Sequence, residues 1–292
     1  MEKIIIKAKD GLDLSCLYSK VNNAKACVQI VHGMVEHKER YIPFIERLNS
    51  EGYTVIISDL RGHGKSINDR YPLGHIGTYN EMIDDQYEVT KFIKNDNVGL
   101  KLYMFAHSMG SLIGRNYLIK YDNEIEKLIL CGTVSYNTGV GFAVFLGKII
   151  NKIKGKYKYS KLLYFFSNNT SFDEDVSWIS TSEKNVIEYQ NDPLCGFKFD
   201  NFSNLNLFIM DNNLKKKNLY GAKNKNLEIL SVSGALDRTT SGTKGLNKVM
   251  KLLNSIGYKN TSFIEYPNMR HEILNEEDNE CVYVDIVNFY NK

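Results

Sequence analysis

The sequence predicts an α/β protein with a mostly parallel sheet and a helical segment inserted near the middle of the chain. Short apolar runs alternate with longer helical patterns in both halves of the chain, an order typical of parallel sheets. Residues 101–117 join a buried strand, a sharp turn and a helix in one window. Residues 136–221 carry a different, helical pattern between two strands of the predicted sheet. These features predict an α/β unit with one insertion.

The composition is that of a soluble globular protein. Of the 292 residues, 43% are hydrophobic and 24% charged, and the net charge of +3 is too small to favour nucleic acid as a partner. The apolar run near the N-terminus is far too short for a signal peptide or a membrane span. The five scattered cysteines form no C-x-x-C pair, so neither a zinc site nor a disulfide framework is indicated. We therefore expect a cytoplasmic protein.

The chain is expected to open with an antiparallel hairpin. Residues 2–9 and 12–19 flank Asp10-Gly11, which is a typical two-residue hairpin turn. The later elements then alternate. Strands are predicted at 26–31, 53–58, 102–106, 127–131, 226–233 and 261–266, and helices at 36–50, 79–94 and 111–121.

The turn Ala106-His107-Ser108-Met109-Gly110 is the first candidate for chemistry. It has the pattern of a G-x-S-x-G nucleophile elbow with alanine in the first small position. Such a turn holds the serine in a strained conformation and presents its hydroxyl to a base. His107 and Gly110 would support this turn. A chance Ser-x-Gly is the alternative, but the strand before it and the helix after it favour a nucleophile.

The chain order indicates which residues would assist Ser108. In proteins with a nucleophile elbow, the catalytic carboxylate and the catalytic histidine follow the serine in the chain, at the ends of later strands. His271 is the only histidine after His107, and it follows the strand predicted at 261–266. Asp237 follows the strand predicted at 226–233, whereas Asp192 and Asp211 lie within the insertion. We therefore expect Ser108 as nucleophile, His271 as general base and Asp237 as the carboxylate that orients the imidazole.

Two backbone amides are expected to form an oxyanion hole. The Met109 amide lies at a helix N-terminus, where the helix dipole favours negative charge. The Met34 amide follows the first buried parallel strand, and Gly33 lets the backbone turn close to a substrate. His32 is expected to be a packed supporting residue.

We expect neither a metal nor another cofactor. A metal site made of histidines would use His32, His37, His63 and His107. No carboxylate or thiolate lies at a spacing from them that is typical of such a site.

The insertion, residues 136–221, is expected to form a helical cap over the carboxyl ends of the strands, where open α/β sheets bind ligands. The core would then comprise residues 1–135 and 222–292. One amphipathic helix is predicted, with Lys148 and Lys152 opposite an apolar face. That face consists of Phe142, Phe145, Leu146, Ile149, Ile150 and Ile153.

The segment 141–166 combines many lysines with aromatic residues. Such a basic, aromatic and amphipathic segment fits contact with an anionic membrane surface, and it equally fits a solvated lysine face over a packed cap. Both interpretations stay open. The run Lys215-Lys216-Lys217 is expected to be a solvated loop.

Five segments together resemble the monoacylglycerol lipase and lysophospholipase branch of the α/β-hydrolases, which is grouped with serine aminopeptidase-like hydrolases. They occur in the family's order along nearly the whole chain: Val31–Tyr41, Asp59–Ser66, Ala106–Ser111, Ser233–Arg238 and Arg270–Glu276. The most specific pieces are HG-x-x-EH-x-x-RY and D-x-RGHG-x-S. Ala106 departs from the glycine that is usual there.

The resemblance implies an eight-stranded core, a cap that controls access of an acyl chain, and hydrolysis of monoacylglycerol- or lysophospholipid-like esters through an acyl-enzyme. It gives catalytic roles to Ser108, Asp237 and His271, and oxyanion donation to the Met34 and Met109 amides. A small lipid-like ester would be the substrate, and no cofactor is implied. Asp192-Pro193-Leu194 also resembles the family.

Two other functions remain open. A serine peptidase that releases N-terminal residues would use the same three side chains but needs an acidic cap site for the substrate's amine. The cap offers Asp173, Glu174, Asp175 and Glu183. A catalytically silent scaffold is the third possibility. A long apolar cavity ending at Ser108 would favour a lipid, and a short pocket closed by carboxylates would favour a peptide.

Overall fold

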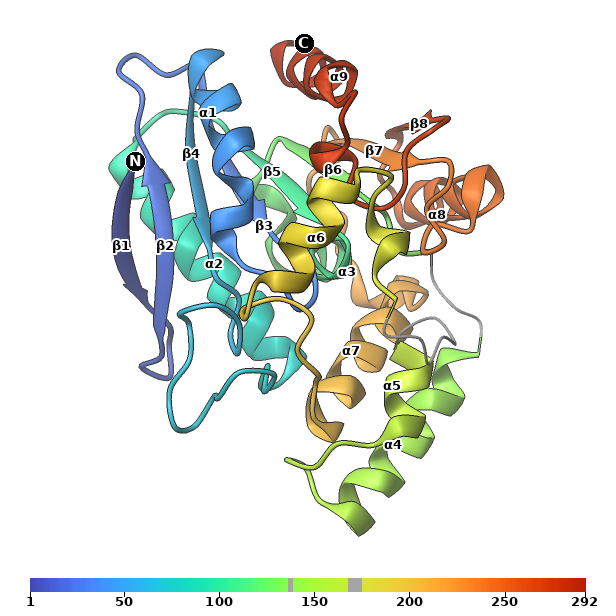
Figure 1. The fold of residues 1–292 in the computed structure, drawn as a ribbon. Helices are drawn as coiled ribbons and strands as arrows, with labels where there is room; N and C mark the ends of the chain where they lie inside the picture. Colours follow the sequence, from blue (N-terminus) through green and yellow to red (C-terminus); the bar gives the residue numbers. More distant parts are fainter. Residues whose placement is uncertain (136–138, 168–174) are drawn as a thin grey trace.

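The chain folds around one eight-stranded sheet of mixed direction, with helices on both faces (Figure 1). The computed structural model describes residues 1–135, 139–167 and 175–292. The strand order is β1-β2-β4-β3-β5-β6-β7-β8. The first two strands are antiparallel to their neighbours and the other pairs are parallel. This confirms the predicted α/β class and the mostly parallel sheet.

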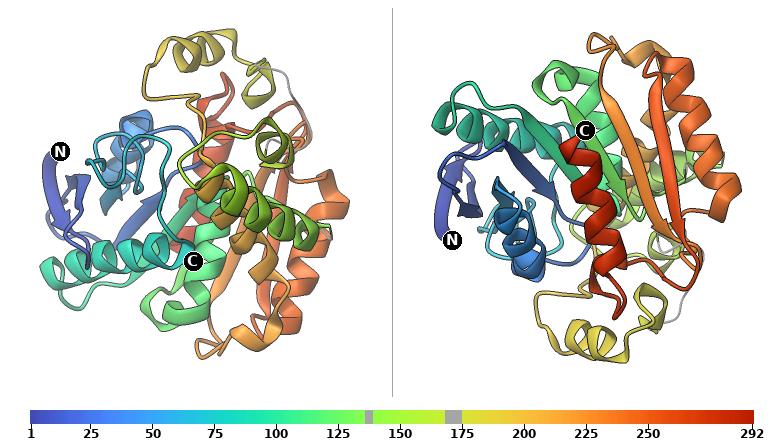
Figure 2. Two further views of the ribbon diagram at one scale, coloured as in Figure 1. Left: turned by 90° about the horizontal axis from the view of Figure 1, so that it is seen from below. Right: turned by 90° about the horizontal axis from the view of Figure 1, so that it is seen from above.

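The strands lie close to the predicted positions. They are β1 Glu2–Lys7, β2 Asp13–Ser19, β3 Ala26–Val31, β4 Tyr53–Ser58, β5 Leu102–His107, β6 Lys127–Cys131, β7 Glu228–Gly234 and β8 Asn260–Tyr266. In Figure 2 the N-terminal strands lie at one edge of the sheet, and β7 and β8 lie at the other. The parallel strands β3, β4, β5 and β6 are buried throughout, as their mostly apolar character predicts.

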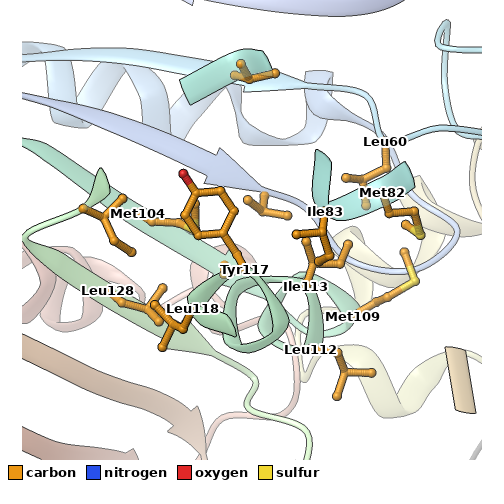
Figure 3. Close-up of a cluster of buried hydrophobic side chains, with 14 of the residues drawn as sticks. Leu60, Met82, Ile83, Met104, Met109, Leu112, Ile113, Tyr117, Leu118 and Leu128 are labelled. Atoms are coloured by element: carbon orange, nitrogen blue, oxygen red, sulfur yellow. The ribbon is translucent and has the colours of Figure 1, made fainter. Parts of the chain in front are cut away.

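The helices form two layers on the sheet and a further group in the insertion. They are α1 Ile42–Ser50, α2 Tyr79–Asp96, α3 Met109–Tyr121, α4 Val140–Lys154, α5 Lys161–Ser167, α6 Glu183–Asn191, α7 Asn201–Leu214, α8 Gly242–Ile256 and α9 Glu280–Asn291. Helices α1 and α9 pack on one face of the sheet, and α2, α3 and α8 pack on the other. Figure 3 shows Tyr117 and Leu118 of α3 beside Met104 and Leu128 of the sheet, and Ile83 of α2 beside Ile113 of α3.

The first hairpin forms as predicted, but the prediction of a two-residue turn is wrong. The last paired residues are Lys7 and Asp13, so residues 8–12 connect the strands. The Ala8 amide donates to the Leu12 carbonyl at 2.9 Å, and Gly11 has a φ of 89°. Within this connection the carboxylate of Asp10 accepts from Arg61 at 2.7 Å, a partner that the local sequence does not reveal.

The insertion lies between β6 and β7 and contains α4, α5, α6 and α7. Figure 1 shows α4, α5 and α7 gathered beside one another. Helix α7 also packs against α3, and its Leu207, Met210 and Leu214 join the main core. A smaller apolar cluster within the insertion joins Val140, Ala143, Ile150, Leu163 and Phe208. Residues 136–221 as a cap, with core segments 1–135 and 222–292, stay our proposed division; residue 136 itself lies outside the described residues.

The predicted apolar face of α4 is only partly buried: Ile150 is buried and Leu146 half-buried, but the other four residues of that face are exposed. Helix α4 buries Val140, Ala143, Gly147 and Ile150, whereas Phe142, Phe145 and Ile153 are 60%, 59% and 77% exposed. The reason is close packing, because a methyl group at Gly147 would lie 3.0 Å from the Leu205 side chain of α7. Small residues let the two helices approach, so the small stripe is buried and the large stripe faces outward.

Candidate active site

Ser108 occupies a strained turn between β5 and α3. Its φ is 53° and its ψ is −117°, a conformation that non-glycine residues rarely adopt. Gly110 is required behind it, because a side chain there would overlap the carbonyl oxygen of Val31. The turn therefore has the geometry of an elbow that holds the serine hydroxyl away from the helix.

Ala106, the departure from the usual glycine, is accommodated by a second small residue. A methyl group at Gly114, in the second turn of α3, would lie only 3.1 Å from the Ala106 methyl. The helix can therefore cross the strand closely although the strand carries a side chain. The hydroxyl of Ser108 still lies within hydrogen-bond distance of Nε2 of His271.

The structure brings Ser108, His271 and Asp237 together at the carboxyl ends of their strands. The Ser108 hydroxyl lies 2.8 Å from Nε2 of His271, and Nδ1 of His271 lies 2.8 Å from Oδ2 of Asp237. His271 and Asp237 are 3% exposed, so water is largely excluded from the bond between them. A serine, an imidazole and a carboxylate in this order can pass a proton from the hydroxyl to the ring.

Thr239 fixes the carboxylate of Asp237, a contact that sequence reasoning missed. Its amide and its hydroxyl both donate to Oδ1 of Asp237 at 2.8 Å, which leaves Oδ2 for the imidazole. Burial alone would raise the pKa of Asp237, but the charge and hydrogen bond of His271, together with Thr239, lower it. Asp237 therefore stays ionised beside the ring.

The rival acids lie elsewhere. Oδ2 of Asp192 lies 2.7 Å from Nε2 of His37. Asp211 lines a cavity near Ser108. Neither carboxylate is bonded to His271 in the part of the chain that the structure describes.

The predicted supporting histidines are buried and neutral. Burial lowers the pKa of His32, and burial together with neighbouring His271 lowers that of His107 to about 4. The ring of His107 packs against that of His271, with centroids 4.8 Å apart. Both histidines are therefore packed residues, as expected for His32.

His32 also orients the peptide that carries the Met34 amide. Its Nδ1 lies 2.9 Å from the Gly33 carbonyl oxygen, and its Nε2 accepts from the Leu60 amide at 2.8 Å. Because the peptide is trans, the Met34 N–H points away from the Gly33 carbonyl and so away from His32. Met34 lines both cavities that reach Ser108, and Met109 lines one of them.

A buried ion network below the Met34 loop was not predicted. Arg40 donates to Glu36 at 3.0 Å and binds both carboxylate oxygens of Glu272 at 2.6 and 2.7 Å. Glu36 in turn accepts from the Gly33 amide at 2.5 Å. The network ties the loop before Met34 to the residue that follows His271. The motif EH-x-x-RY contains Glu36 and Arg40, so the sequence did mark them, but not their partners.

The only tryptophan of the chain, Trp178, covers the site from the insertion. Its ring centroid lies 4.9 Å from that of His271, and the Arg238 guanidinium lies 4.1 Å from the centroid of the Trp178 ring. Apart from the rarity of tryptophan, nothing in the sequence indicates this contact.

Two cavities reach Ser108. The larger, of about 630 Å³, is lined mainly by apolar side chains of α3, α4, α5 and α7: Met109, Leu112, Val140, Phe142, Ala143, Phe166, Leu207 and Phe208. The smaller, of about 360 Å³, has more polar walls, among them Glu36, Asp175, Gln190, Lys198 and Asn204. Ser108, Met34, Trp178 and Arg238 line both. The serine therefore lies where an apolar and a more polar compartment meet.

One group of side chains has the spacing of metal ligands, although the sequence indicated none. His37, Asp192 and Cys195 offer atoms within 4.8 Å of one another. However, Nδ1 of His37 is bonded to Glu39 at 2.8 Å and Nε2 to Asp192 at 2.7 Å. The imidazole thus bridges two carboxylates, which raise its pKa against the opposing effect of burial. An imidazole whose two ring nitrogens are both bonded to carboxylates does not fit metal binding.

Comparisons with known proteins show the family of the chain. The model of the serine aminopeptidase S33 family matches residues 22–278. The phospholipase YtpA of Bacillus subtilis is 26% identical over 268 residues, which cover 90% of this chain and 94% of the relative. A monoacylglycerol lipase of Mycolicibacterium smegmatis is 24% identical over 270 residues, 91% of this chain and 88% of the relative.

A solved structure agrees with the fold. A thermostable carboxyl esterase of Bacillus coagulans, solved with glycerol, superposes with a TM-score of 0.86 at 25% identity, covering 99% of this chain and 97% of its own. The fold is that of the α/β-hydrolases, and the chain is an ester hydrolase of the lipase type. The match over residues 22–278 shows that the chain belongs to the serine aminopeptidase S33 family of hydrolases.

Proposed function

We propose that the protein hydrolyses monoacylglycerol- or lysophospholipid-like esters through an acyl-enzyme on Ser108. The observation that carries this proposal is the chain of two 2.8 Å contacts from Ser108 through His271 to Asp237, beside a large cavity with mainly apolar walls. The relatives named phospholipase and monoacylglycerol lipase support the same substrate class.

The proposed reaction has two halves. In the first, Ser108 attacks the ester carbon while His271 takes the hydroxyl proton, and His271 then gives this proton to the leaving alcohol. In the second, His271 takes a proton from water, which attacks the acyl-enzyme, and returns it to Ser108. Asp237 stabilises the imidazolium in both halves. The Met34 and Met109 amides stabilise the oxyanion, and each such donor contributes on the order of 3 kcal/mol to the transition state.

The two cavities suggest how the substrate lies. An acyl chain fits the larger cavity because its walls are mainly apolar. The alcohol part fits the smaller cavity, where polar side chains can bind hydroxyl or phosphate groups. The ester carbon then lies at Ser108, which both compartments share.

The acids near the smaller cavity give little support to a peptidase. Glu36 and Glu272 are both paired with Arg40, and Asp175 accepts from the amide and hydroxyl of Ser177 at 2.8 Å. Glu183 lines neither cavity reaching Ser108. Asp173 and Glu174 lie outside the described residues. Each described carboxylate that lines the smaller cavity is therefore already bonded within the protein, and Asp211 is the carboxylate that lines the larger cavity.

A substrate panel tests the proposal. We expect turnover of p-nitrophenyl esters to rise in kcat/KM from acetyl to octanoyl by about tenfold or more, because each buried CH₂ contributes about 0.8 kcal/mol in an apolar cavity. Aminoacyl p-nitroanilides should be hydrolysed far more slowly. Faster hydrolysis of the anilides would favour the aminopeptidase function, and inertness toward both classes would favour a silent scaffold.

The exposed side of α4 is the proposed membrane contact. We call Phe142, Phe145, Ile149 and Ile153 the α4 ridge; all four are exposed. Residues 139–167 carry Lys148, Lys152, Lys154, Lys156, Lys158 and Lys161 and no acidic residue. Phe142 also lines the larger cavity, so the ridge adjoins the compartment proposed for the acyl chain. Among residues 1–135, 139–167 and 175–292, no helix is both long and apolar enough to cross a bilayer.

Vesicle sedimentation tests this contact. We expect binding to phosphatidylcholine vesicles that contain phosphatidylglycerol, and weaker binding as salt is added, since salt screens the lysines. The variant Phe145→Ser/Ile153→Ser should lower partitioning by about tenfold or more, because two apolar anchors are lost. Val98→Ser, at a residue 86% exposed outside the ridge, is the matched control. Equal partitioning of the ridge variant and the control would contradict the proposed contact.

A further inference from the structure

Val35, which directly follows Met34, has a backbone conformation that valine rarely adopts. Its φ is 52°, in the left-handed region, where a β-branched side chain crowds the backbone. Among the described residues other than glycine that have a positive φ, Val35 is the only β-branched one. A conformation of this kind persists only where the surroundings hold it.

The contacts that hold Val35 come from the core on one side and from the cap on the other. Its amide donates to Nε2 of His63 at 3.2 Å. Its carbonyl oxygen accepts from the Gly196 amide at 2.9 Å and from the Tyr189 hydroxyl at 3.1 Å. A carbonyl oxygen has two lone pairs, so the two cap donors satisfy it fully.

The cap segment that supplies these donors is itself fastened to the same loop. The ring of His37 bridges Asp192 and Glu39, and Asp192 lies between the two donors in the chain. The Arg40 guanidinium lies 5.0 Å from the centroid of the Tyr189 ring, which places the tyrosine over the buried ion network. Residues 189–196 of the cap and residues 33–40 of the core therefore form one connected unit.

Met34 lies between two anchors of this unit. On its N-terminal side, Gly33 is held by Glu36 and by His32. On its C-terminal side the chain direction depends on the φ of Val35. If Val35 relaxed to a negative φ, the backbone after Met34 would turn, and the amide plane of Met34 could keep its orientation only by compensating rotations elsewhere.

We infer that Tyr189 and Val35 are positioning residues: the cap, through the Tyr189 hydroxyl and the Gly196 amide, holds Val35 in its strained conformation and so aims the Met34 amide at the oxyanion. This inference rests on the proposed function, which makes that amide an oxyanion donor. It means that the cap does more than enclose the substrate, because it completes the site that stabilises the transition state.

The test combines Tyr189→Phe with Val35→Gly. Loss of the hydroxyl should lower kcat on p-nitrophenyl butyrate by about tenfold, less than the full loss of an oxyanion donor, and leave KM within about twofold. Glycine adopts a positive φ without strain, so V35G should lower kcat less than Y189F does. In the V35G background, Y189F should then cost less than about threefold, a coupling that a double-mutant cycle measures directly.

Tyr258→Phe is the matched control. It removes a buried tyrosine hydroxyl that donates to Asp122 at 3.1 Å, outside the loop and the cap. It should lower the unfolding temperature and leave kcat unchanged, which separates general loosening from an effect on the oxyanion site. The unfolding temperature of every variant is measured alongside its kinetics.

Two results would overturn the inference: a kcat for Y189F equal to that of the wild type, or equal losses from Y189F in the wild-type and V35G backgrounds. A different result would contradict the proposed function. If the wild-type protein does not hydrolyse esters, or does so without Ser108, the proposed reaction is wrong, whereas a Ser108-dependent esterase with an unaffected Y189F rejects only the role of Tyr189 and Val35.

Discussion

Replacing Ser108 with alanine is expected to lower kcat for ester hydrolysis by on the order of 10⁶-fold, because loss of the nucleophile removes the acyl-enzyme route altogether. The Ser108 hydroxyl lies 2.8 Å from Nε2 of His271, and no other hydroxyl is bonded to that nitrogen among the described residues. The rapid initial release of p-nitrophenol that we expect from acylation of the wild type should be absent in the variant. A fluorophosphonate probe should label the wild type but not the variant. The KM of any residual activity is expected to change little.

Ser111→Ala is the control for this experiment. Ser111 lies one helical turn along α3, and its hydroxyl accepts from the Val134 amide at 3.2 Å rather than from the site. We expect full labelling of Ser108 and activity within a few-fold of the wild type. Persisting fluorophosphonate labelling in folded S108A would mean that another residue is the nucleophile.

Replacing Asp237 with asparagine is expected to lower kcat by about 10⁴-fold, since the amide favours the wrong tautomer of His271 and cannot stabilise the imidazolium. The pH profile should change as well. Burial alone would lower the pKa of His271, but the charge and hydrogen bond of Asp237, with Glu272 and Glu36, raise it above its ordinary value of 6.5.

The direction of the pH effect follows from the role of His271. The base must be neutral, so wild-type kcat/KM should fall as pH decreases through an apparent pKa above 6.5. In D237N the charge that raises this pKa is lost, and the acid limb should move to lower pH. D192N is the comparison, since its carboxylate contacts His37; its acid limb should coincide with that of the wild type. An acid limb that moves in D192N but not in D237N would identify Asp192 as the acid.

The periodic part of the fold was predictable because buried parallel strands are marked by their own residues. Strands such as Ala26–Val31 and Leu102–His107 are buried throughout and mostly apolar, since helices cover both faces of the sheet. The residues of the candidate site were predictable for a related reason. Parallel strands end at one edge of the sheet, so Ser108, Asp237 and His271 each follow a strand end and meet there.

The face of α4 could not be predicted in the same way. Its sequence offers two stripes of apolar residues, and periodicity favours the larger one. The structure buries the stripe of Ala143 and Gly147 instead, because only small side chains allow α4 to approach Leu205 of α7. The choice depends on a neighbour that is distant in the chain, and in the connection of the first hairpin Asp10 likewise contacts a distant partner, Arg61.

By itself the sequence determined the class of the fold, the strained turn at Ser108 and the order of the three side chains that converge on it, because each follows from local pattern and chain order. Only the tertiary structure decided which residues of the insertion contact the strand ends and loops of the sheet: Trp178 over His271, and Tyr189 and Gly196 on the carbonyl of Val35. Such contacts join segments that are far apart in the chain, and they depend on how two packed units fit, which no local pattern encodes.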